Sequence, residues 1–189
     1  MTPRRRIPAL ARAAARFRRS EAGTSTVEFA LSLPVMIALF LASFDLAVMN
    51  IRQLMIGRGL DLAVRDLRLG AWPNLDTDTL KQAVCEGTGG FIPDCANQLM
   101  IELVPVPQPG WSLPDPGATC VDRDEEVQPA VTFNPGAQNE MMIVRACVLV
   151  DPIVPGSALA LRLQDSPGDG VALVATSGFV NEPLAGGSL

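Results

Sequence analysis

Two carboxylates and four cysteines are the side chains of this chain whose types and positions could do chemistry. Glu28 precedes one long apolar run and Asp45 lies near the far end of that run. A carboxylate beside lipid is costly unless a charge pairs with it, so these acids indicate charge pairing rather than turnover. Four cysteines can form two disulfides in an oxidising compartment. The chain has no histidine, which excludes a histidine base and a histidine-ligated metal.

The other candidates for catalysis or metal binding are weaker. Lys81 is the one lysine and no glycine-rich loop precedes it, which excludes a P-loop. The run "VDRDEE" contains Asp122, Asp124, Glu125 and Glu126, but its spacing is not that of an EF-hand, and such charge runs are usually solvated. A membrane-bound hydrolase would lack a workable base. We therefore expect no enzymatic activity, no metal and no cofactor.

The apolar run predicts a membrane-spanning helix. Phe29 to Met49 is 21 residues long, which gives a helix of about 31 Å, enough to cross a bilayer. Pro34 lies near its start, where a missing amide costs least. No small-residue cleavage site follows the run, which favours a retained anchor over a secretory signal. Seven arginines precede the first acid and indicate a cytoplasmic N-terminus, with a nucleic-acid-binding arm as the alternative: Arg4, Arg5, Arg6, Arg12, Arg16, Arg18 and Arg19.

An amphipathic helix is expected to continue beyond the span. Ile56, Leu60, Ala63 and Leu67 repeat at helical spacing and form an apolar stripe. Gly70 and Pro73 then end the helix. Such a stripe packs on the protein's own core more often than on a partner.

The rest of the chain predicts a small antiparallel sheet with short helices. A second helix is expected from about Leu75 to Val84, capped by Asn74 or Asp76. Strands are expected at Leu99–Val104, Met141–Asp151 and Val171–Val180, and the middle one is apolar on nearly both faces, which places it centrally. The long segment Pro105–Glu140 reads as a loop. A helical turn is expected near Ala158–Leu163. The fold class is α+β: a long N-terminal transmembrane helix that continues into a disulfide-stapled extracytoplasmic domain.

All four cysteines follow the span. Their even number fits two disulfides, with three possible pairings. We favour Cys85–Cys95 as a local loop and Cys120–Cys147 as a link between the long loop and the central strand. No C-x-x-C pair exists, so a zinc site is the weaker alternative.

The start of the span resembles the class III signal of type IV pilins and pseudopilins. Gly23 immediately precedes Thr24, Glu28 is fifth after the glycine, and Phe29 opens the apolar run. The resemblance implies cleavage after Gly23 by a prepilin peptidase, which frees the amine of Thr24. It also implies that Glu28 meets that amine on a neighbouring subunit and sets the register between helices. The alternative is that Glu28 lies in the headgroup layer and complements the helix N-terminus.

Further segments resemble TadE-like proteins, the minor pseudopilins of tight-adherence pili. These are the N-terminal "VEFALSLPVMIALFLASFDLAVMN" with Asp45 near its outer end, the middle "MMIVRACVLVDP", and the tail "VALVATSGFVNEPL" that closes with Asn181, Glu182 and Pro183. Phe29 stands where the major pilin usually has tyrosine, and a large outer domain follows. Both departures favour a minor subunit, and TadE-like and TadF-like roles stay open.

The resemblance implies a three-part organisation. Residues 1–23 would be a cleaved cytoplasmic leader, 24–70 the transmembrane and amphipathic helix, and 71–189 a periplasmic α+β domain. The protein would be a single-pass subunit of the bacterial inner membrane that acts in pilus assembly and adhesion, either retained there or incorporated into the pilus. Its partners would be a prepilin peptidase, other pilin-like subunits and the inner-membrane assembly platform, with no nucleic acid. The alternative is an unprocessed, membrane-anchored periplasmic binding or sensor domain.

Overall fold

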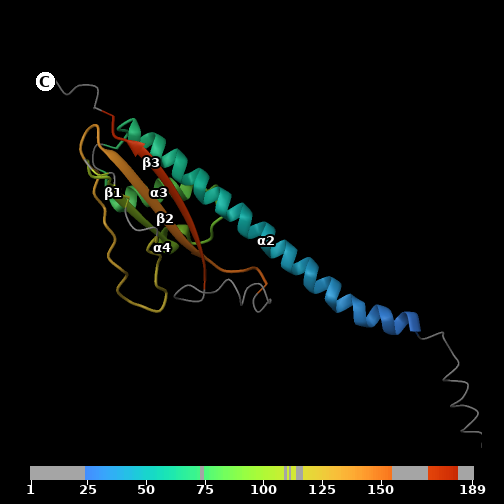
Figure 1. Cartoon of the computed structure of the whole chain (residues 1–189). Coiled ribbons are helices and arrows are strands. Elements are labelled where there is room, and N and C mark those ends of the chain that lie inside the picture. Colours follow the sequence, from blue (N-terminus) through green and yellow to red (C-terminus); the bar gives the residue numbers. More distant parts are fainter. Residues whose placement is uncertain are drawn as a thin grey trace, which may run out of the picture. The chain divides into compact units, whose positions relative to one another are not determined.

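The computed structural model describes residues 24–72, 75–108, 110, 112–113, 117–154 and 170–182. Its elements are α2 (Thr24–Arg68), α3 (Thr77–Gly87), α4 (Cys95–Gln98), β1 (Leu99–Pro105), β2 (Met141–Val150) and β3 (Val171–Val180) (Figure 1). The chain forms two compact units, residues 1–41 and 42–189, and each is described by itself.

The first unit contains the N-terminal part of α2. Its large apolar side chains are exposed, as with Leu31 and Phe40, which are 72% and 71% accessible. Pro34 lies inside the helix. Among the described residues, α2 is the one helix long and apolar enough to cross a membrane. Exposed apolar side chains on so long a helix are what a lipid-facing segment requires.

The second unit is built on a three-stranded antiparallel sheet with the order β1-β2-β3. The central position of β2 was predicted because both faces of this strand are apolar. The three strands begin at the predicted residues and end within one residue of the predicted ends. Helix α3 begins after Asp76, which accepts a hydrogen bond from the Thr79 amide at 2.7 Å. The short helix α4 was not predicted. Asn74 and the turn expected at Ala158–Leu163 lie outside the described residues.

One face of the sheet packs against α2 and α3. Ile56, Leu60 and Ala63 of α2 are at most 1% exposed, and Leu67 is partly buried against the same core. The predicted stripe therefore packs on the chain's own domain. The sheet contributes the alternate residues that point to this face: Leu99, Ile101, Leu103, Met142, Val144, Ala146, Val148, Val150, Val171, Leu173, Ala175 and Phe179.

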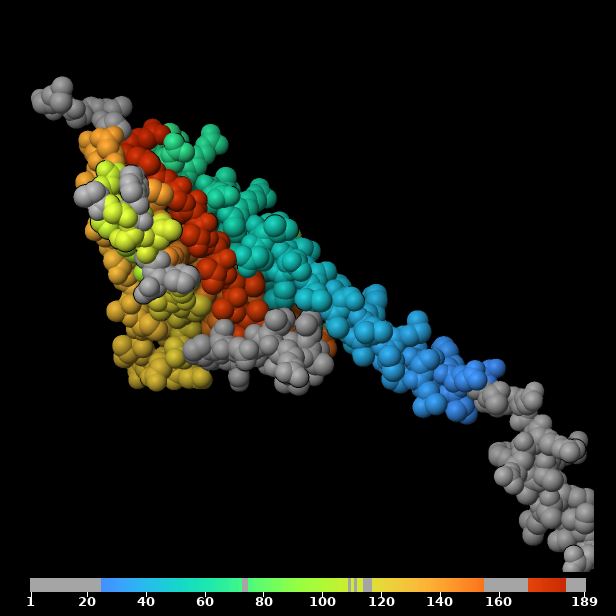
Figure 2. Space-filling view, viewed as in Figure 1, coloured from blue at the N-terminus to red at the C-terminus, as the bar shows by residue number. Residues whose placement is uncertain are grey.

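The opposite face of the sheet is covered by the segment 117–134. Met100, Val121 and Leu149 form a small second core there. At the edge of β1, the Leu103 amide donates to Thr132 and the Leu103 carbonyl accepts from Asn134, both at 2.9 Å. Both faces of β2 are thus buried, which explains its continuous apolar sequence. Figure 2 shows that β3 (red) instead remains visible along its length beside α2 (teal).

Candidate functional site

The residues of the expected cleavage and registry site lie at the start of α2. Glu28 is exposed, and Phe29 is 63% exposed. Thr24 is the first described residue of the helix, and Gly23 lies outside the described residues. Between Thr24 and Phe44, Glu28 is the one charged residue, and it therefore presents a carboxylate on an otherwise uncharged helix surface.

Asp45 has a different environment, because it is buried in the second unit. Its side chain is 2% exposed. Its Oδ1 accepts hydrogen bonds from the amides of Ile153 at 2.9 Å and Val154 at 3.2 Å. The role in registry between helices that the resemblance implies for Asp45 stays a prediction. The structure shows that these two bonds link the helix to the turn after β2, and no local pattern in the sequence signals them.

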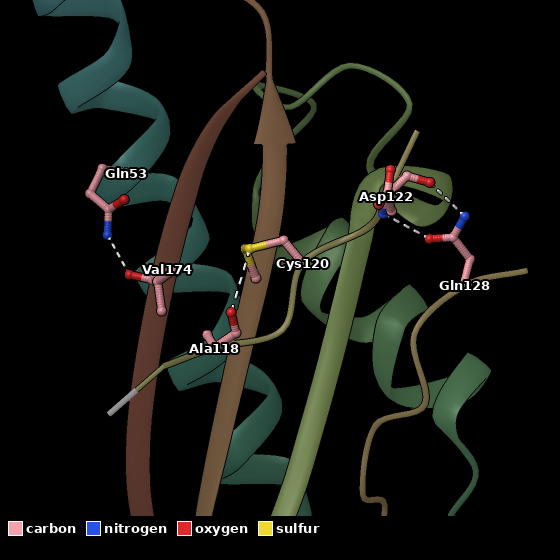
Figure 3. The surroundings of a disulfide bond; sticks show 7 residues. Gln53, Ala118, Cys120, Asp122, Gln128 and Val174 are labelled. Carbon is pink, nitrogen blue, oxygen red and sulfur yellow. Dashed lines mark hydrogen bonds between the residues drawn. A yellow bond between two sulfur atoms is a disulfide. The ribbon is translucent and has the colours of Figure 1, made fainter. Parts of the chain in front are cut away.

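Two polar side chains on the next turns of α2 also bind the sheet. Arg52 donates from Nη1 to the Asp151 carbonyl at 2.8 Å. Gln53 donates from Nε2 to the Val174 carbonyl at 2.8 Å (Figure 3). Since Val174 belongs to β3 and Asp151 directly follows β2, the helix is joined to both strands where it enters the second unit. These contacts give the domain a fixed orientation on this part of α2.

Arg123 connects the covering segment to the same end of the sheet, a role that the sequence did not reveal. Its Nε donates to Gln98 Oε1 at 2.8 Å, and its Nη1 to Asp151 Oδ1 at 2.6 Å. A third bond reaches the Leu149 carbonyl at 3.3 Å. The Arg123 side chain is 23% exposed, so these bonds are partly shielded from water and fix the segment in one position.

A second arginine that the sequence analysis missed lies on the covered face of β2. Arg145 is 8% exposed and stands opposite Glu102 of β1, with 3.7 Å between Nη1 and Oε2. Its Nη1 also donates to the Gly117 carbonyl at 2.9 Å. Opposite charges that face each other across an antiparallel pair stabilise the register of the two strands.

The structure contains two disulfides, with the pairing that the sequence analysis favoured. Cys85–Cys95 joins α3 to α4, with 5.8 Å between the Cα atoms. Cys120–Cys147 joins the covering segment to β2, with 5.1 Å between the Cα atoms (Figure 3). The first disulfide closes a local loop between two helices, and the second attaches the covering segment to the sheet.

The tail residues close the domain at its far end. The Asn181 side chain donates to the carbonyls of Pro135 at 2.8 Å and Ala137 at 3.1 Å. Glu182 pairs with Arg68, the last residue of α2, at 3.0 Å. Both side chains of that ion pair are about half exposed, so it contributes little stability. Pro183 lies outside the described residues.

The acidic segment forms an ordered turn. The Gln128 side chain donates to the Asp122 carbonyl at 2.8 Å and accepts from the Asp122 amide at 2.9 Å (Figure 3). It also donates to the Glu125 carbonyl at 3.0 Å. Among the described residues, no group of three or more acidic or cysteine side chains could hold a metal ion. The arrangement is that of a solvated turn, in which the glutamine supplies the hydrogen bonds.

Comparison with known proteins identifies the N-terminal part of the chain. Residues 23–65 match the family described as TadE-like protein, which confirms the resemblance of the N-terminal segment; the resemblance of the middle segment and the tail stays a prediction. The match suggests a pilus-associated protein of the tight-adherence type. A single candidate span near the N-terminus of the described chain fits a membrane-anchored protein. No curated protein and no solved structure matches the chain.

Proposed function

We propose that this TadE-like chain is a minor pilin-like subunit of a tight-adherence pilus, cut after Gly23 by a prepilin peptidase. The observation that carries the proposal is the position of Glu28. It is the fifth residue after Gly23 and is exposed on an apolar helix, within the segment that matches the family. A carboxylate at this place in a span is costly unless a cation pairs with it.

Cleavage would supply that cation. The amine of Thr24 becomes a terminal ammonium group once the leader is removed, and it lies at the same end of the helix as Glu28. In a bundle of such helices, the ammonium group of one subunit pairs with Glu28 of its neighbour. The pair offsets the cost of removing both charges from water, and it sets the register between subunits. Removal of the leader also takes away the seven arginines that hold the precursor's end in the cytoplasm.

The other parts of the chain fit this role. Residues 24–70 would anchor the subunit in the inner membrane, and 71–189 would form the periplasmic domain. Two disulfides in that domain support an oxidising compartment. The partners would be the peptidase, other pilin-like subunits and the inner-membrane assembly platform.

The start of the mature chain tests the cleavage directly. Intact-mass analysis of the protein extracted from membranes of a host with the pilus system should give a chain that begins at Thr24. A chain that begins at Met1 or Thr2 would overturn the proposal and leave an unprocessed anchored binding or sensor domain. The same host without its prepilin peptidase is the control, and there the full precursor mass is expected.

The charge of Glu28 can be tested apart from its size. Glu28→Gln keeps the shape and removes the charge, so surface pili should be reduced at least tenfold. Glu28→Asp keeps the charge and should retain more pili than Glu28→Gln. Glu126→Gln, a change at an exposed acid of the periplasmic turn, is the matched control and should leave the pili at normal levels. Normal assembly with Glu28→Gln would contradict the charge pairing.

A further inference from the structure

The outer edge of the membrane on α2 can be located from the point where the domain begins to cover the helix. Phe40 and Phe44 are 71% and 48% exposed, whereas Asp45 is 2% and Met49 7% exposed. Asp45 is covered by backbone amides of the chain itself. Irregular backbone does not lie in the hydrocarbon facing lipid, because water is absent there to bind its polar groups. On the side of the helix that the domain covers, the hydrocarbon therefore ends before Asp45, whereas Leu46 and Leu54 on the other side are 44% and 70% exposed.

The turn after β2 lies at the same level as this edge. The amides of Ile153 and Val154 bind the Asp45 carboxylate, so these residues meet the helix where the lipid-facing part ends. These amides satisfy the Asp45 carboxylate, whereas the Ile153 side chain is 46% exposed. Arg52, which binds the Asp151 carbonyl, adds a cation about two helical turns beyond Asp45. A protein surface that contacts phospholipid typically combines exposed apolar side chains with cations farther from the hydrocarbon, and Ile153 and Arg52 have this combination.

We propose that the turn Asp151–Val154 is a membrane-contact surface, and that its partner is the headgroup layer of the outward-facing leaflet. Ile153 enters the boundary between headgroups and acyl chains, and Arg52 lies among the phosphates. The inference rests on the membrane anchoring in the proposed function, but not on cleavage or pilus assembly.

One consequence concerns the depth of Glu28. Thr24 to Phe44 is 21 residues, which spans about 31 Å as a helix and matches a hydrocarbon core of about 30 Å. The span therefore moves toward the N-terminus from Phe29–Met49, the range that the sequence suggested. Glu28 then lies inside the inner edge of the hydrocarbon rather than outside it. This position strengthens its need for a cationic partner.

Tryptophan quenching in the full chain, reconstituted in phospholipid vesicles, tests the contact. The quencher is a phospholipid brominated on its acyl chains near the headgroup end. Three variants are compared with the parent chain, whose Trp72 and Trp111 set the background emission. Ile153→Trp probes the turn, Phe40→Trp probes the span, and Leu69→Trp is the control. Leu69 is 67% exposed and follows the last residue of α2 at the far end of the domain.

The proposal expects the added emission of Ile153→Trp to be quenched at least twofold, as for Phe40→Trp, with Leu69→Trp unquenched. Quenching of Phe40→Trp without quenching of Ile153→Trp would overturn the contact surface and leave the anchor intact. If Phe40→Trp is also unquenched, the helix does not cross the bilayer, and both this inference and the proposed function fail. Equal quenching of Ile153→Trp and Leu69→Trp would show non-specific adsorption and would likewise overturn the proposal.

Discussion

Gly59 of α2 and Gly87 of α3 lie backbone to backbone where the two helices cross. A Cβ added to Gly87 would stand 2.6 Å from the Gly59 Cα, and one added to Gly59 would meet the Val84 carbonyl oxygen. Neither atom belongs to a flexible side chain, so the helices would have to move apart. Close packing of α3 on α2 therefore requires glycine at both positions.

Gly59→Ala is expected to destabilise the second unit by about 1–3 kcal/mol, the usual cost of overpacking a tight contact. Thermal unfolding of the full chain in detergent measures the effect. Gly57→Ala is the matched control, because a Cβ at Gly57 meets nothing within 4 Å. Alanine there should be neutral, or stabilising by up to about 1 kcal/mol through its helix propensity. Equal effects of the two substitutions would contradict the crossing geometry.

Asp45→Ala is expected to release the turn after β2 from the helix. The change removes the acceptor of the Ile153 and Val154 amides, whose bonds are partly shielded from water. A fully buried amide without a partner costs about 1–3 kcal/mol, so the loss should lie at the lower end of this range. Hydrogen exchange at these two amides should become faster, while exchange within β2 changes little. Asp45→Asn retains a carbonyl oxygen and should have the smaller effect. Unchanged exchange at both amides in Asp45→Ala would show that Asp45 does not bind them.

The two disulfides should differ in their contribution to stability. The half-cystines are 27 residues apart in Cys120–Cys147 and 10 apart in Cys85–Cys95. Closing the longer loop restricts the unfolded chain more. In the chain-entropy account, each disulfide stabilises the fold by about 3–4 kcal/mol, and the longer loop adds roughly 1 kcal/mol more than the shorter one. Replacement of each pair by serines, followed by chemical denaturation, should give the larger loss for Cys120–Cys147. The opposite order would show that contacts in the folded state outweigh loop closure.

Asp76 should make the stability of α3 depend on pH in the acid range. Hydrogen bonds from Thr79, first from its side chain and then from its amide, hold the pKa of Asp76 below the ordinary value of 3.8. A group whose pKa is lowered by folding stabilises the fold above its unfolded pKa and loses this contribution as the pH falls through the folded value. Asp76→Asn lacks this titration. The difference in melting temperature between the parent chain and Asp76→Asn should be constant near neutral pH and change only below about pH 4.

The order and type of the elements could be predicted from the sequence because each has a local signal. The strand at Met141 reads as central since it is apolar on both faces, and the stripe from Ile56 to Ala63 reads as a buried helix face. Helix α4 has four residues, which is too short for a periodic pattern. Its N-cap, Asp94, has a positive φ of 48°, which neighbouring residues do not encode.

The contacts that orient the domain on α2 could not be predicted, because their partners are far apart along the chain. Asp45 and Ile153 are separated by 108 residues, and Gln53 and Val174 by 121. Hydrophobic alternation shows which side chains of a strand face inward, but not which segment covers them. The contacts of Arg123 and the glycine contact between α2 and α3 could not be predicted for the same reason, since they form only when distant segments meet.

The bonds between α2 and β3 have a consequence for the order of events during biosynthesis. Gln53 and Arg68 lie on α2, which is made before the sheet, while their partners are Val174 of β3 and Glu182, which follows β3. Until β3 has been made, β2 lacks one neighbouring strand and the apolar stripe of α2 lacks part of the sheet that covers it. The domain can therefore complete its folding only after β3 and Glu182 have been made, and the open edge of β2 and the apolar stripe of α2 must be protected from aggregation until then.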